Sequence, residues 1–221
     1  MHCTDIVIDQ VVYSTVPAEV ESMDSWRELF NGRNLDGWVF RGKADESAPT
    51  FEVEDATIVG RTRIPANATA FLATEQQFED FELYFEVRID QDLNSGVQVR
   101  STPEGTVRGA QVDIQNGSER TGFIFGQGMG KWLTQDIAEV SRGNHAFRDG
   151  EWNQFRVRVE GGNVKTWVNG QQVADTTHED IASAGVIALQ VHAHPRGQQR
   201  ESGAKEVLSV KWRNIKVSEI N

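Results

Sequence analysis

Hydrophobic and polar residues alternate along most of this chain. In residues 81–89, FELYFEVRI, every second position is a large apolar residue, and Glu, Tyr and Arg occupy the positions between. Residues 94–101, 109–115 and 185–191 repeat this two-residue period. Such alternation is typical of β-strands that turn one face toward a core. The pattern therefore predicts many short strands.

Turn signals separate the strand segments. Gly161-Gly162 lies between two alternating segments, and Asn169-Gly170 is the dipeptide that most strongly favours a two-residue hairpin. Short strands with frequent turns along most of the chain predict an all-β fold, an antiparallel sandwich.

Few segments depart from this strand-and-turn pattern. Residues 131–143 and 178–184 are the two segments in which a turn or two of helix is expected. Residues 1–24 are acidic and show little pattern, so we expect an N-terminal extension there and a single sandwich domain over residues 25–221. No repeat or linker divides that domain.

Composition narrows the range of partners. The 22 basic and 33 acidic residues give a formal net charge of −11, which argues against binding of nucleic acid or an anionic membrane surface. Cys3 is the single cysteine, so no internal disulfide forms. No apolar run approaches the ~20 residues of a membrane-spanning helix, and residues 1–10 lack the basic start and apolar stretch of a secretory signal.

Three strands are expected to place planar polar side chains on one face: Gln98 and Arg100 on the first, Gln111, Asp113 and Gln115 on the second, and Gln190, His192 and His194 on the third. Amide, guanidinium, carboxylate and imidazole groups suit the binding of sugar hydroxyls, and the six tryptophans offer flat surfaces for sugar rings. The alternative is an ordinary solvent-exposed sheet face.

Metal or phosphate chemistry has weaker support. His192 and His194 are two residues apart on one strand, so they would chelate a metal ion if a carboxylate joined them. Two polar side chains at a strand end are the simpler interpretation. No phosphate-binding loop, zinc-ligand spacing or nucleophile elbow is present.

An ordered set of segments resembles one protein family over about residues 25–220. The segments are LFNGRNLDGW, DFELYFEVRID with NSGVQVRS, GAQVDIQ, GEWNQFRVRVEGGNVKTWVNGQQVAD, GVIALQVH and WRNIKV. They resemble the 3-keto-disaccharide hydrolase family, long called domain of unknown function 1080. The resemblance implies a concanavalin A-like jelly-roll sandwich of two antiparallel sheets and a periplasmic or extracellular location. It also implies cleavage of glycosides whose sugar carries a ketone at carbon 3.

That substrate suggests roles for the polar face. The ketone acidifies the proton on C2, so a base can remove it and the glycosidic oxygen on C1 can leave, after which water adds. We expect Asp113 and His192, on neighbouring strands, to supply acid–base chemistry, with Asp113 either the base or the group that orients the imidazole. The residues expected to bind substrate are Arg100, Gln98, Gln111, Gln190, Gln127 and Lys131. A divalent cation is another possible means of polarising the ketone.

The sequence departs from the family pattern at two points. Relatives carry a glutamate at the position of Gln127, and a His-Ser-Gly-Pro segment where this chain has residues 192–195, HAHP. If that carboxylate is a catalytic acid or a metal ligand in relatives, its replacement by an amide predicts reduced activity here. Three interpretations therefore stay open: an enzyme acting on 3-keto-glycosides, a non-catalytic carbohydrate-binding module on the same fold, and an interaction domain whose site has decayed.

Overall fold

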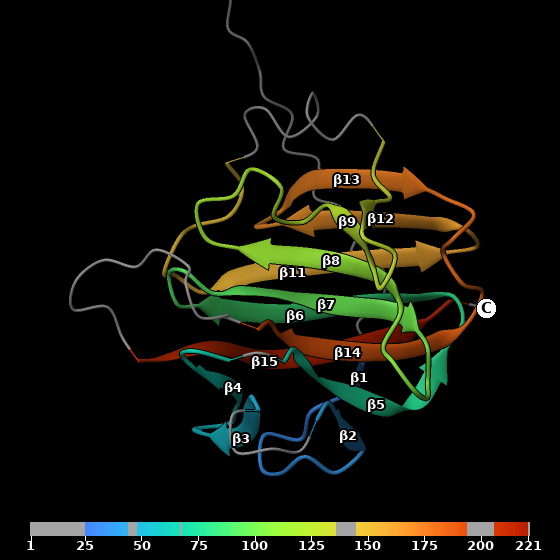
Figure 1. Cartoon of the computed structure of the whole chain (residues 1–221). Helices are drawn as coiled ribbons and strands as arrows, with labels where there is room; N and C mark the ends of the chain where they lie inside the picture. Colours follow the sequence, from blue (N-terminus) through green and yellow to red (C-terminus); the bar gives the residue numbers. More distant parts are fainter. Residues whose placement is uncertain (1–24, 44–47, 67, 136–144, 194–205, 221) are drawn as a thin grey trace, which may run out of the picture.

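Two antiparallel β-sheets pack face to face in the computed structural model (Figure 1), which confirms the predicted all-β sandwich. The structure describes residues 25–43, 48–66, 68–135, 145–193 and 206–220, and these contain no α-helix. None of the described segments is therefore a helix with the length and apolarity that crossing a bilayer requires. The expected extension over residues 1–24 lies outside the described residues.

One sheet has eight strands. Its order is β13 (Gln171–Thr177), β12 (Asn163–Val168), β11 (Asn153–Glu160), β6 (Phe81–Ile89), β15 (Val207–Glu219), β4 (Thr57–Arg63) and β3 (Thr50–Glu54), with β1 (Arg27–Glu28) also paired to β15. The strand whose alternation is clearest in the sequence, β6, lies near the middle of this sheet.

The other sheet has seven strands. Its order is β10 (Lys131–Trp132), β9 (Ile124–Gln127), β8 (Gly109–Gln115), β7 (Asn94–Ser101), β14 (Gly185–Val191), β5 (Ala70–Phe78) and β2 (Trp38–Arg41). The three strands with polar faces, β8, β7 and β14, are adjacent in this sheet, so the topology brings those faces together (Figure 1).

Apolar residues from both sheets fill the space between them. The predicted inward positions of β6 are all at most 2% exposed, and so are Val97 of β7, Val112 of β8 and Leu189 of β14. The rings of Phe85 and Phe155 stack with centroids 5.0 Å apart. Burying each such side chain contributes roughly 1.5–3 kcal/mol, so the two-residue period fixes which face of each strand turns inward.

The hairpins agree with their sequence signals, whereas the helices do not. Gly161 and Gly162 join β11 to β12, and Asn169-Gly170 joins β12 to β13 with φ of 49° and 83°, the left-handed values that a type I′ turn needs. Residues 178–184 form turns, so the second expected helix is wrong: seven residues offer too few internal hydrogen bonds to hold a helix without packing support. The first expected helix begins with β10, and residues 136–144 lie outside the described residues.

A β-bulge interrupts the alternation of β7. Ser101 pairs with Val186 and Gln98 with Ala188, so Val99 and Arg100 together oppose the single residue Ile187. Arg100 has a φ of 50° in this bulge. The extra residue changes the side of the sheet to which the following side chains point, and Arg100 consequently leaves the face that strict alternation assigns to it.

Arg100 instead ties together three turns. Its guanidinium donates hydrogen bonds to the carbonyl oxygens of Glu79, Gly161 and Ala182, and it forms an ion pair with Asp80. The residue is 1% exposed. A buried guanidinium with four partners is a structural cross-link, because four of its five N–H donors are already occupied.

Replacing this cross-link tests its role. We expect Arg100→Met to lower the free energy of unfolding by about 2–4 kcal/mol, because three carbonyls and one carboxylate lose their donor. Urea unfolding measures this loss. Arg63→Met, at an exposed position of β4, is the matched control and should change stability by less than about 0.5 kcal/mol. Unaltered stability of Arg100→Met would contradict the structural role.

Candidate active site

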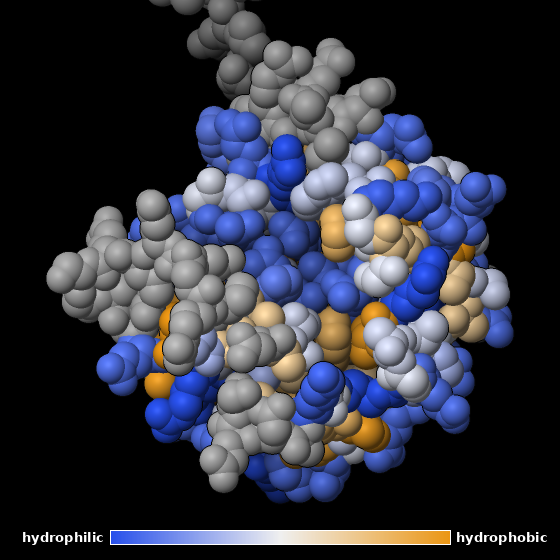
Figure 2. Space-filling view, viewed as in Figure 1, coloured by the Kyte–Doolittle hydropathy of each residue, from blue (hydrophilic) through white to orange (hydrophobic). Residues whose placement is uncertain are grey.

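A pocket of about 370 Å³ opens on the outward side of the seven-stranded sheet. Its lining residues are Asn94, Gln111, Asp113, Gln115, Ser118, Arg120, Phe125, Gln127, Trp132 and His192. Figure 2 views the same face and shows hydrophilic residues gathered over β7 and β8. The pocket therefore forms where the polar faces of three adjacent strands meet.

Strand register lays the site out in rows across β8, β7 and β14. Gly96 of β7 pairs with Asp113 on one side and Gln190 on the other. In the next row Asn94 pairs with Gln115, and its carbonyl accepts a 3.4 Å hydrogen bond from the backbone N–H of His192. The centre of the first row has no side chain, because it is a glycine.

The Gln111 side chain occupies the space above Gly96. A Cβ at position 96 would lie 2.6 Å from Cγ and Cδ of Gln111, closer than real atoms approach. This clearance lets Gln111 reach across β7: its Oε1 accepts hydrogen bonds from Nε2 of Gln98 at 2.5 Å and of Gln190 at 2.8 Å. With both donors on its oxygen, the Gln111 amide points its Nε2 toward Asp113 Oδ1, 3.4 Å away.

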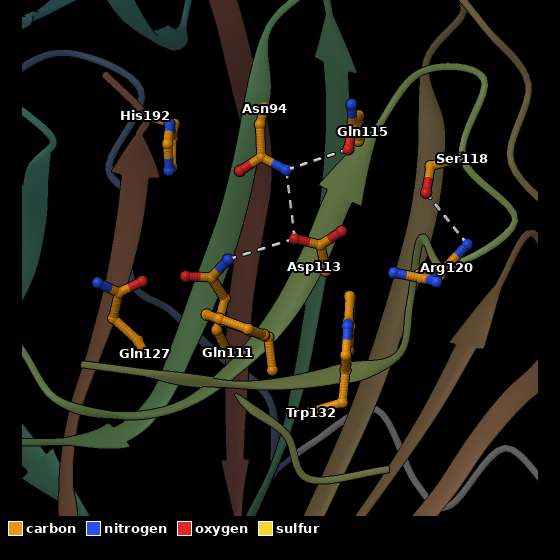
Figure 3. A pocket seen from close by; sticks show the side chains of 10 residues that line it. Asn94, Gln111, Asp113, Gln115, Ser118, Arg120, Gln127, Trp132 and His192 are labelled. Carbon is orange, nitrogen blue, oxygen red and sulfur yellow. Dashed lines mark hydrogen bonds between the residues drawn. The ribbon is translucent and has the colours of Figure 1, made fainter. Parts of the chain in front are cut away.

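Asp113 is the buried titratable group of the pocket. It is 7% exposed, and Asn94 Nδ2 donates to the same Oδ1 at 3.3 Å (Figure 3). Burial raises the pKa of the Asp113 carboxyl to about 6, while hydrogen bonds from Asn94 and Gln111 and the positive charge of Arg120 partly oppose this rise. A carboxyl with a pKa near neutrality can both take up and release a proton, as a catalytic acid or base must.

His192 lies at the opposite side of the pocket from Trp132 (Figure 3). It follows the end of β14, is exposed, and its Nδ1 donates to the Ala193 carbonyl at 2.7 Å, so Nε2 is the nitrogen left for other partners. β7 separates β14 from β8. The expectation of neighbouring strands is therefore wrong. Two strand spacings of ~4.8 Å place the backbones of His192 and Asp113 at least about 10 Å apart. Asp113 does not orient the imidazole; the two groups face different parts of one pocket.

An aromatic wall with one cation closes the side nearest β10. The Phe125 and Trp132 rings meet edge to face with centroids 5.3 Å apart, and Arg120 Cζ lies 5.5 Å from the Trp132 ring centroid. The sequence interpretation considered Trp132 only as one of the six tryptophans suited to sugar rings, and it did not assign Phe125 or Arg120 to the site. Phe125 lies two residues before Gln127 and so shares its strand face, but Arg120 belongs to a turn that carries no periodic signal.

The structure gathers most, but not all, of the expected site residues. Gln111, Asp113, Gln127 and His192 line the pocket. Gln98 and Gln190 are fully buried and act on the pocket through Gln111, and Gln190 Nε2 also donates to Gln127 Oε1 at 3.2 Å.

Two basic residues expected at the site do not line it. Arg100 is buried in the turn cross-link, and Lys131 forms an ion pair with Asp180 at 2.8 Å. Their expected substrate contacts are therefore not part of the pocket. The cation that the pocket does present on its aromatic wall is Arg120.

The donor set gives little support for the divalent cation considered from the sequence. Within the described ranges, no three His, Cys, Asp or Glu side chains come together as a metal site requires. His194, the other half of the possible chelating pair, lies outside the described residues.

Comparison with known proteins agrees with this architecture. The model of the family described as "3-keto-alpha-glucoside-1,2-lyase-like domain" matches residues 25–218, and the chain belongs to that family. It is thus a carbohydrate-related domain of the glycosyl hydrolase-like type. No curated protein sequence matches the chain.

Solved structures show the same fold at low sequence identity. A proposed glycosyl hydrolase from Parabacteroides distasonis ATCC 8503 is 19% identical with a TM-score of 0.60, over 89% of this chain and 94% of that one. A Bacillus subtilis protein with a galectin-like fold is 9% identical with a TM-score of 0.58, over 84% and 90%. The carbohydrate binding module CBM66 from Bacillus subtilis is 14% identical with a TM-score of 0.52, over 83% and 96%.

A side chain at position 96 of β7 should disrupt the site, because Gln111 occupies the space above Gly96. In Gly96→Ala the new methyl group would overlap the buried Gln111 side chain, so we expect a loss of about 1–3 kcal/mol in unfolding free energy. Displacing Gln111 also removes a donor from Asp113, so the pKa of Asp113 should rise further above its ordinary value. Urea unfolding and NMR titration of the carboxyl carbon measure the two effects. Gly162→Ala is the control, because its nearest neighbour lies 3.7 Å away. An Asp113 titration identical to wild type in Gly96→Ala would refute this role for Gly96.

Asp113 should also lower stability at neutral pH. Its pKa is raised from 3.8 to about 6 in the folded chain, so stability falls as pH rises through this interval, in which the unfolded chain ionises first. Asp113→Asn keeps the Oδ1 acceptor but carries no charge. We expect it to be more stable than wild type by about 2–3 kcal/mol at pH 7.5, with the difference vanishing near pH 3.5.

Chemical unfolding at the two pH values checks this expectation. Asp175→Asn, at an exposed position of β13, is the control and should show no such pH-dependent gain. If Asp113→Asn were less stable than wild type at pH 7.5, the carboxylate would be stabilised rather than penalised in the fold.

Proposed function

We propose that this protein cleaves glycosides whose sugar carries a ketone at C3, by removing the C2 proton and eliminating the group on C1. The observation that carries the proposal is Asp113: a buried carboxyl with a pKa of about 6, which accepts hydrogen bonds from two amides in a pocket of about 370 Å³. Membership of a family described as lyase-like supports the reaction type.

Asp113 is the base of the proposed reaction. Its Oδ1 already accepts two hydrogen bonds, so Oδ2 is the atom that takes the C2 proton. The electron pair of the C2–H bond passes into the C2–C3 bond, and the ketone becomes an enolate. As the ketone re-forms, a C1–C2 double bond forms and the C1–O bond breaks. Addition of water across that double bond, with OH on C1 and H on C2, gives the free 3-keto-sugar.

His192 is the proposed acid for the leaving oxygen. It lines the same pocket as Asp113 but follows β14, which β7 separates from β8, so the two groups act on different atoms of one bound sugar. Protonated Nε2 gives its proton to the departing oxygen while Nδ1 stays bonded to the Ala193 carbonyl. Because the two side chains are separated, Asp113 can reach the C2 proton while His192 reaches the oxygen on C1. Two side chains in direct contact would not reach both positions.

Carbohydrate binding without catalysis is the second candidate function. Gln127 favours it, because the amide at this position donates no catalytic proton and is engaged with Gln190. The same pocket would then recognise sugar hydroxyls through its amides and stack a ring against the aromatic wall.

Turnover of a 3-keto-glucoside separates the two functions. We expect release of the aglycone by wild type, with the acidic limb of kcat/KM rising as pH increases through about 6, because Asp113 must be ionised in the free protein. Asp113→Asn and His192→Ala should each lower kcat by about 10²–10⁴-fold, and Asp175→Asn should match wild type. Binding of the 3-keto-glucoside by calorimetry without any release would instead favour the binding module.

A further inference from the structure

We propose that Arg120, resting on Trp132, is the catalytic cation that stabilises the enolate oxygen. This inference rests on the proposed function, and it places at the ketone oxygen an arginine other than Arg100, which was expected to bind substrate. Arg120 lines the pocket, whereas Arg100 is buried in a cross-link between turns.

The reaction needs a positive group at one defined atom. When the C2–H bond breaks, negative charge accumulates on the ketone oxygen attached to C3. A preorganised cation or set of donors at that oxygen lowers the barrier, because charge develops there only in the transition state. C2 and C3 are bonded to each other, so the base and this cation must lie close together without neutralising one another.

Arg120 and Asp113 meet that requirement. The positive charge of Arg120 acts on Asp113, yet no hydrogen bond or ion pair joins the two side chains in the described part of the chain. Figure 3 shows both side chains on the wall of the same pocket, with Arg120 beside Asp113 and between Ser118 and Trp132 in this view. A substrate oxygen can therefore reach the cation while its neighbouring carbon faces the carboxylate.

The Trp132 ring holds the Arg120 guanidinium through a cation–π contact. Arg120 Cζ lies 5.5 Å from the Trp132 ring centroid, and Phe125 supports that ring at its edge. Trp132 is also fixed by its pairing with Phe125 in the β9–β10 ladder. Stacking on a ring face leaves the guanidinium N–H groups available for an oxygen acceptor.

The turn that carries Arg120 is itself fixed. The backbone N–H of Arg120 donates to Ser118 Oγ at 3.2 Å, and the Arg120 carbonyl accepts a hydrogen bond from the Phe123 N–H at 3.0 Å. Within the described ranges, no carboxylate forms an ion pair with the Arg120 guanidinium. Its charge is thus held at the pocket and left for a ligand.

Hydrogen exchange at C2 measures formation of the enolate, the step that Arg120 is proposed to stabilise, separately from departure of the leaving group. The probe is 1,5-anhydro-3-keto-glucitol, a ketone with no exocyclic leaving group on C1, incubated with enzyme in D₂O and followed by loss of the C2 proton signal. We expect Arg120→Met to slow both exchange and kcat for a 3-keto-glucoside by about 10²–10³-fold, with KM changed by less than about threefold. Arg120→Lys should keep part of the activity because it keeps the charge.

Chemical rescue distinguishes catalysis from support of the pocket. Added guanidinium ion should restore exchange in Arg120→Met and have no such effect in Asp113→Asn. Arg63→Met is the matched control and should behave as wild type, because Arg63 lies exposed on β4 in the other sheet. Exchange in Arg120→Met at the wild-type rate, or a loss confined to KM, would overturn the inference while leaving the proposed function intact. Absence of exchange and cleavage in wild type would overturn both.

Discussion

The approach of Gln111 across Gly96 is the contact on which the candidate site depends. Glycine removes the one side chain that would occupy the centre of the row between Asp113 and Gln190, and the Gln111 amide fills that space. Because Gln98 and Gln190 both donate to its oxygen, the amide can present only its N–H groups to Asp113. The Gln111 amide therefore holds one orientation. If it turned over, its Nε2 would face the Nε2 donors of Gln98 and Gln190, and these buried donors would lose their acceptor.

This arrangement explains how a carboxylate is kept in a buried position at a functional pH. Burial alone favours the neutral acid, whereas the two amide donors and the charge of Arg120 favour the anion. The balance leaves the pKa of Asp113 at about 6, and ionising it at neutral pH works against folding. A site that lowers stability in this way fits a group kept for chemistry rather than for packing.

The bulge in β7 decides which arginine lines the pocket. Placing Val99 and Arg100 against Ile187 turns Arg100 away from the pocket and into three turns at the end of the sandwich. The pocket then receives its cation from the turn that follows β8. One extra residue in a strand thus separates an arginine that supports the fold from an arginine that faces the site.

The sequence by itself determined the sandwich, its hairpins and most of the polar face. Alternation fixed the inward residues of β6, β7, β8 and β14, because a two-residue period has one solution when one face is buried. The same period identified Gln111 and Asp113, and the family resemblance added Gln127; all three line the pocket.

Only the tertiary structure decided the strand order, the bulge and the aromatic wall. Strand order placed β7 between Asp113 and His192, and no local pattern contains that information, because pairing joins residues distant in the chain. Arg120 and Trp132 meet through the β8–β9–β10 meander, and their contact depends on where the turn ends. Local periodicity sets which way a side chain points along a regular strand, whereas its neighbours are set by how strands pair and where regularity breaks.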